Sequence, residues 1–170
     1  LGGRAQQMIN DRLLVHCDLL VGIFWTRLGS PTGVAASGTV GLLNDYFTLM
    51  VDCTVKEGGM LDKYIGDAIM AAFGVPIEHD DDEGRAVRCS IAMLKSLDAW
   101  NAERQADGKL PVNIGIGLNT DLIVSGNIGS PTRMNYTLIG DGVNLASRLE
   151  SACKQYAAKL LISEYTFRKL

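Results

Sequence analysis

Apolar and polar positions alternate with two different periods along this chain, and the changes of period predict where helices and strands lie. Residues 42–53 repeat apolar side chains every three or four positions, which is typical of a helix with one buried side. Residues 112–118 alternate apolar with polar or small side chains, which is typical of a half-buried strand. The expected elements are a helix from Thr39 to about Lys56, strands over Leu61–Ile65 and Ala68–Phe73, a helix from about Asp80 to Asn101, strands over 112–118, Leu122–Ile128 and Met134–Ile139, a helix from about Gly142 to Tyr156, a strand over Leu160–Ser163 and a helix from Glu164.

This order of elements predicts the fold class. Strands occur in consecutive pairs joined by short turns such as Gly66-Asp67, and such pairs form antiparallel hairpins. One more strand is expected before Thr39. We therefore predict an α+β fold with an antiparallel-rich sheet and with the helices on one face.

Composition and charge limit the number of domains and the kinds of binding partner. The 170 residues suit one domain, so residues 1–170 are treated as a single domain. A net charge of −3 gives no electrostatic basis for binding nucleic acid. The apolar stretch Leu13–Trp25 is too short and too polar to span a bilayer. We expect a soluble, cytoplasmic domain that does not itself enter a membrane and, since it begins at Leu1, belongs to a longer chain.

The four cysteines indicate a reducing compartment. Cys17, Cys53, Cys89 and Cys153 are widely spaced and form no C-x-x-C pair. Three of them fall in apolar periodic segments, where cysteine behaves as a small buried residue. We predict free core thiols and no structural disulfide.

An acidic run at 80–83 follows His79 and has two interpretations. Carboxylates next to a histidine could form a metal cluster. Alternatively, the negative charges stabilise the positive end of the helix that begins there. We prefer the second interpretation.

The helix expected from Gly142 has a polar face of chemical interest. With Val143 as origin and 100° per residue, Asn144 and Arg148 fall at about 100° and 140°, one turn apart. The apolar stripe of Ala146, Leu149 and Cys153 lies on another side. Arg148 offers a planar set of donors suited to phosphate oxygens, and Asn144 can donate or accept beside it. A solvated helix face would have the same pattern.

The sequence lacks the common nucleotide-binding motifs, such as a Walker loop or G-x-G-x-x-G. Three ordered stretches nevertheless resemble class III adenylyl and guanylyl cyclase catalytic domains, most closely the cyanobacterial type of bacterial adenylyl cyclase. They are LLNDYF…GGMLDKYIGDAIMAAFG (42–74), VNIGIGLNT…VSGNIGS (112–130) and NYTLIGDGVNLASRLE (135–150). The resemblance covers about Thr39–Phe167 and implies a ferredoxin-like core that pairs head to tail, with active sites at the homodimer interface.

The resemblance also implies roles for individual residues. Lys63 and Thr137 match the two base-selecting positions, and this pair favours adenine over guanine. Asn144 and Arg148 match the residues that orient the ribose and stabilise charge at the α-phosphate. The implied reaction converts ATP to 3′,5′-cyclic AMP and pyrophosphate.

The family binds two Mg²⁺ or Mn²⁺ ions per active site through two aspartates. Asp67, at the tight Gly66-Asp67 turn, matches one of them, and a carboxylate at such a turn can approach a hard cation closely. Asp18 is the best candidate for the other, although its surroundings match poorly and the separation from Asp67 is longer than expected.

Two departures from the family pattern leave alternatives open. Residues 5–37 look atypical, and the family domain continues past Leu170 with a cationic triphosphate contact, so the domain is expected to be truncated. The alternatives to an adenylyl cyclase are a guanylyl cyclase and a catalytically inactive dimerisation or regulatory module. Sensor domains are expected elsewhere on the full-length chain.

Overall fold

A computed structural model describes residues 17–26 and 36–170, with side-chain surroundings from residue 40 onward. Most of the segment 5–37 therefore lies outside the described residues. The elements, in chain order, are β1 (Cys17–Thr26), α2 (Ala36–Lys56), β2 (Met60–Ile65), β3 (Ala68–Phe73), α3 (Asp82–Ala106), β4 (Ile114–Ser130), β5 (Arg133–Ile139), α4 (Asp141–Gln155), β6 (Leu160–Ile162) and α5 (Glu164–Phe167).

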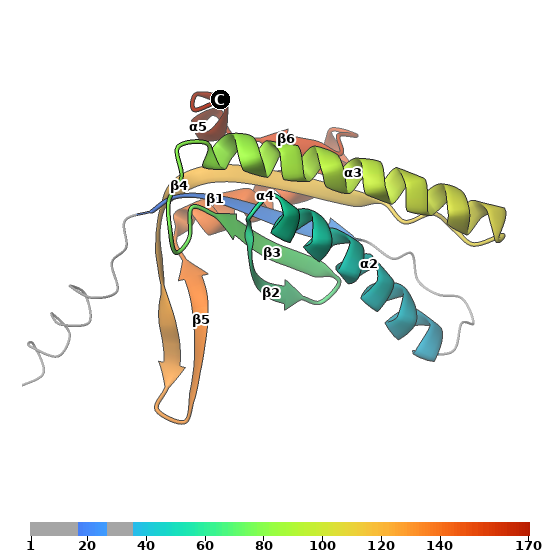
Figure 1. Cartoon of the computed structure of the whole chain (residues 1–170), viewed down its shortest axis with the longest axis horizontal. Helices are drawn as coiled ribbons and strands as arrows, with labels where there is room; N and C mark the ends of the chain where they lie inside the picture. The colour runs from blue at the N-terminus through green and yellow to red at the C-terminus, as the bar shows by residue number, and fades with distance from the viewer. Residues whose placement is uncertain (1–16, 27–35) are drawn as a thin grey trace, which may run out of the picture.

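The strands form a sheet in the order β2-β3-β1-β4-β5, with β6 beside β4. Every pair on this path is antiparallel, and β6 joins β4 in parallel. β1 is the strand expected before the first helix, and it occupies the centre of the sheet (Figure 1). The predicted α+β class is confirmed.

β4 corrects one predicted boundary. The sequence predicted separate strands over 112–118 and Leu122–Ile128, but the structure has a single strand of 17 residues. Its first part pairs with β1 up to Ile123, and its second part pairs with β5 from Val124 onward. Because the pairing with β5 begins where the pairing with β1 ends, the backbone hydrogen bonds of β4 continue along its length, and no turn divides the strand. The β4–β5 hairpin consequently extends away from the rest of the sheet (Figure 1).

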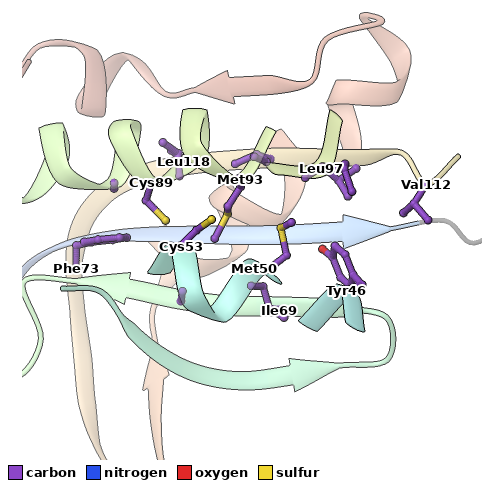
Figure 2. Packing of buried hydrophobic residues seen from close by; sticks show 14 residues of the cluster. Tyr46, Met50, Cys53, Ile69, Phe73, Cys89, Met93, Leu97, Val112 and Leu118 are labelled. Carbon is purple, nitrogen blue, oxygen red and sulfur yellow. The ribbon is translucent and has the colours of Figure 1, made fainter. Parts of the chain in front are cut away.

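The helices cover both faces of the sheet, which corrects the predicted single covered face. Helices α2 and α3 pack over one face, around Met50, Met93 and Ile69 (Figure 2). Ala146 of α4 packs instead with Met70 and Ala72, which alternate with Ile69 along β3. Successive strand residues face opposite sides, so α4 lies on the other face.

The acidic run and the cysteines have structural roles. Asp82 accepts hydrogen bonds from the His79 amide and from Arg85 Nη1, both at 2.7 Å. Among the described residues no group of three or more His, Cys, Asp or Glu could hold a metal ion. The thiols of Cys53, Cys89 and Cys153 are free and buried, and Cys17 lies outside the described side chains.

Candidate active site

Lys63 and Thr137 lie in contact although they are 74 residues apart in sequence. Lys63 is on β2 and Thr137 on β5, so the contact joins strands from opposite ends of the sheet order. The Lys63 ammonium donates a hydrogen bond to Thr137 Oγ1. The lysine side chain is 41% exposed, whereas Thr137 is only 9% exposed. The two side chains form a partly open polar site with one cationic donor.

Asp62 is a third member of this site that the sequence did not reveal. Its side chain is fully buried, with Oδ2 3.4 Å from Lys63 Nζ. Thr137 Oγ1 donates a long hydrogen bond of 3.4 Å to the same oxygen. Burial raises the pKa of Asp62, while the Lys63 charge and the hydrogen bonds from Lys63 and Thr137 oppose that rise. Adjacent residues of a regular strand face opposite sides, so strand periodicity does not predict that the side chains of Asp62 and Lys63 both reach Thr137.

Helix α4 follows β5 almost directly and carries the other two predicted residues. Asn144 and Arg148 are both exposed, as the helical count predicted. Ala146 and Cys153 are buried, also as predicted. The face that these two polar side chains share is therefore open to a ligand or to a second chain.

The buried side of α4 contains a carboxyl group that the sequence did not predict. Glu150 is only 6% exposed and packs over Gly115 and Gly117 of β4. A Cβ at Gly117 would lie 2.2 Å from the carbonyl oxygen of Ala146. Burial raises the pKa of Glu150, and the hydrogen bond from Ser151 opposes that rise. Gly115 and Gly117 were the sequence signal for this packing, because glycine in a strand allows a helix to approach it closely.

The two predicted metal ligands are not brought together. Asp67 lies in the turn between β2 and β3, two residues before Ile69, which pairs with Phe24 of β1. Asp18 lies six residues before Phe24 and pairs with Leu122 of β4. At roughly 3.3 Å per residue, this separates Asp18 from the Asp67 end of the sheet by about 20 Å. The described residues therefore do not fit a metal site built from this pair.

The fold is that of a nucleotide cyclase catalytic domain. Residues 23–170 match the family described as the adenylate and guanylate cyclase catalytic domain, and the chain belongs to that family. The predicted family is thereby confirmed. Asp18 precedes the matched residues, whereas the other five predicted site residues lie within them.

Both adenylyl cyclases and guanylyl cyclases are similar to this chain. An adenylate cyclase of Anabaena cylindrica is 42% identical over 132 residues, covering 75% of this chain and 25% of that protein. The solved adenylyl cyclase CyaB from P. aeruginosa is 37% identical with a TM-score of 0.79, covering 89% of this chain and 79% of that one. The solved guanylyl cyclase Cya2 is 34% identical with a TM-score of 0.79, covering 91% of this chain and 80% of that one.

The chain spans about a quarter of the length of that Anabaena relative and 6% of an adenylate cyclase of Dictyostelium discoideum, to which it is 36% identical. Within the described residues, no helix is long and apolar enough to cross a membrane.

Proposed function

We propose that this domain is an adenylyl cyclase that converts ATP to 3′,5′-cyclic AMP and pyrophosphate. The observation that carries the proposal is the contact between Lys63 and Thr137, made across the sheet on a partly exposed surface. An ammonium donor and a hydroxyl acceptor side by side complement the ring nitrogen and the amino group of adenine. Cytoplasmic ATP is the proposed substrate.

The proposed reaction joins the ribose 3′-oxygen to the α-phosphorus and breaks the bond from that phosphorus to the bridging oxygen of pyrophosphate. The hydroxyl proton leaves to water or to the substrate, and pyrophosphate takes the electron pair of the broken bond. Arg148 stabilises the negative charge that develops on the phosphoryl oxygens, and Asn144 orients the ribose. Both side chains are exposed on α4, where a ligand can reach them.

We propose that the active sites form between two copies of the chain. Strands β4 and β5 expose a group of large apolar side chains, which is typical of a surface that another protein covers. The group comprises Leu122, Val124, Ile128, Met134, Tyr136 and Ile139. A homodimer would bury this surface and bring Asn144 and Arg148 of each chain toward the other.

The proposed reaction uses a divalent metal ion. Mg²⁺ or Mn²⁺ is expected for the family, and Asp67 at its glycine turn remains the proposed ligand of this chain. In this register Asp18 pairs with Leu122, about six residues along β1 from the level of the turn that carries Asp67. This observation favours a second candidate function, a cyclase-like module that dimerises but forms no product.

One experiment tests the proposal against both alternatives. Purified protein is incubated with ATP or GTP and Mn²⁺, and cyclic nucleotide is quantified by mass spectrometry. Cyclic AMP formed faster than cyclic GMP is the expected result, and the reverse order would make the domain a guanylyl cyclase. A dimer that yields neither product, and binds no non-cyclisable ATP analogue in a calorimetric titration, would identify the inactive module.

A further inference from the structure

An irregularity in β2 explains how Asp62 comes to lie beside Lys63. Leu61 pairs with Ala71 of β3, but Lys63 pairs with Met70, so Asp62 is an extra residue on one strand. Such a β-bulge changes the direction of a side chain, and bulges are common next to active sites. Asp62 and Lys63 consequently both reach Thr137, although adjacent residues of a regular strand face opposite sides.

The hydrogen bonds of Thr137 can be fully accounted for. A threonine hydroxyl has one hydrogen to donate and two lone pairs that accept. Thr137 Oγ1 is the donor in its hydrogen bond to Asp62 Oδ2. Burial raises the pKa of Asp62, but the adjacent ammonium of Lys63 opposes that rise and favours the ionised carboxylate, which only accepts. The hydroxyl hydrogen of Thr137 therefore points to Asp62, and one lone pair receives the hydrogen bond from Lys63. What remains for a ligand is a single acceptor.

The site thus presents an acceptor at Thr137 next to a donor at Lys63. Adenine carries the matching edge, with a donating 6-amino group beside a ring nitrogen that accepts. Guanine carries the opposite edge, with an accepting 6-oxo group beside a ring N–H that donates. Without a carboxylate to orient it, the threonine hydroxyl could donate to a 6-oxo group as readily as it accepts from an amino group.

We propose that Asp62 is a specificity-determining positioning residue, which selects 6-aminopurine over 6-oxopurine nucleotides by fixing the hydrogen of the Thr137 hydroxyl. This inference rests on the proposed binding of a purine nucleotide at Lys63 and Thr137. Asp62 acts through these two residues and does not touch the ligand, because its own side chain is fully buried.

The stability of the fold does not explain this carboxylate. Its Oδ1 atom is buried and has no hydrogen-bond partner among the described residues. A buried oxygen without a partner costs free energy, and a well-packed apolar residue often replaces a buried ion pair without loss of stability. Such an unfavourable carboxylate is expected where it has a functional task, which here is to orient the Thr137 hydroxyl so that its oxygen accepts a hydrogen bond from the ligand.

The test compares Asp62→Asn with the wild-type protein, using α,β-methylene analogues of ATP and GTP in calorimetric titrations with Mg²⁺. The asparagine amide can donate to Thr137 and release its hydroxyl hydrogen, so we expect the preference for the ATP analogue to fall about tenfold. The control is Asp52→Asn, at an exposed position of α2, which keeps the wild-type preference. Thermal unfolding of each variant shows whether it is folded.

The outcomes separate this inference from the proposed function. If wild-type protein binds neither analogue, the proposed function fails. If wild-type protein prefers the ATP analogue and folded Asp62→Asn keeps the same preference, Asp62 has no role in selection and the inference is overturned.

A second measurement needs no variant and applies even if Asp62→Asn does not fold. Wild-type protein is titrated with the triphosphates of adenosine, of purine riboside, which lacks the 6-amino group, and of inosine, which has a 6-oxo group. An acceptor fixed at Thr137 predicts affinity falling in that order, with inosine triphosphate at least tenfold weaker than ATP. Equal affinity for ATP and inosine triphosphate would contradict the oriented hydroxyl.

Discussion

At the scale of single residues, two charged side chains of α4 lie in opposite surroundings although they are only two positions apart. Arg148 is exposed on the face shared with Asn144, whereas Glu150 is buried against β4. The exposed cation is available to a phosphate, while the buried carboxyl group affects the stability of the helix that carries that cation. The first residue should therefore influence turnover and the second should influence folding.

Replacement of Arg148 by alanine should lower kcat by about 100- to 1,000-fold, because preorganised charge at the transition state contributes on this order. A substantially unchanged KM would indicate that the interaction forms mainly in the transition state. Steady-state production of cyclic AMP measures both quantities. Lys154→Ala, at an exposed position of the same helix, is the matched control and should retain wild-type kcat. Wild-type kcat in Arg148→Ala would rule out the proposed role of this residue.

Replacement of Glu150 by glutamine should change how stability depends on pH. Because burial raises the pKa of Glu150, the folded state binds more protons than the unfolded state in which the pKa is about 4.3. The free energy of unfolding contributed by this group is therefore lost as pH rises above that value. Glu150→Gln should unfold at a higher temperature than wild type near neutral pH, with the difference disappearing toward about pH 4.

Calorimetric melting over this pH range measures the Glu150 effect. Glu103→Gln, at an exposed glutamate of α3, serves as the control and should follow the wild-type curve. A constant difference between Glu150→Gln and wild type at every pH would show that packing, not ionisation, is responsible.

At the scale of elements, α4 is positioned by its close approach to β4. A Cβ at Gly117 would meet the backbone of Ala146 at 2.2 Å and the backbone nitrogen of Glu150 at 2.4 Å, and backbone atoms cannot move aside as side chains do. The helix therefore depends on glycine at this strand position. Asn144 and Arg148 keep their places only as long as this contact holds.

Gly117→Ala should accordingly destabilise the fold by about 2–3 kcal/mol, as overpacking does in well-packed cores. The matched control is Gly41→Ala in α2, where a Cβ would meet nothing within 4 Å. That substitution should stabilise the protein by up to about 1 kcal/mol, because alanine is the better helix former. Urea denaturation monitored by circular dichroism compares the two, and equal stability of both variants would contradict the close-contact interpretation.

At the scale of the whole molecule, the β4–β5 hairpin extends beyond the body of the sheet (Figure 1), and it carries exposed apolar side chains. Met134 of this hairpin is 59% exposed, and Ile139 is 50% exposed. A surface of this kind is costly in water, and the proposed second copy of the chain would cover it. The site proposed for nucleotide binding would then be complete only in the dimer.

Met134→Glu should weaken the dimer by at least about tenfold in Kd, because it places a charge in the apolar part of the interface. Sedimentation velocity over a range of concentrations measures the dissociation constant. Ile91→Glu, at an exposed apolar residue of α3, is the control and should leave the association unchanged. If Met134→Glu associates as wild type does, the dimer is formed through a different surface.

Local patterns in the sequence were sufficient for some of these features and not for others. Helical spacing placed Asn144 and Arg148 on an exposed face, and glycine marked the turn that carries Asp67. The continuous β4 was missed, because its antiparallel pairing passes from β1 to β5 partway along its 17 residues. The position of α4 on the second face of the sheet was also missed, because both faces of β3 consist of apolar residues.

The sequence by itself determined the element types, the α+β class, the family and the candidate residues, because these depend on local periodicity and on ordered motifs. Only the tertiary structure decided which candidates meet. It joined Lys63 to Thr137, added Asp62 through a bulge that no periodicity encodes, and separated Asp18 from Asp67. The physical reason is that strand register and sheet curvature bring distant residues together, and both depend on hydrogen bonds between strands rather than on the sequence of either strand alone.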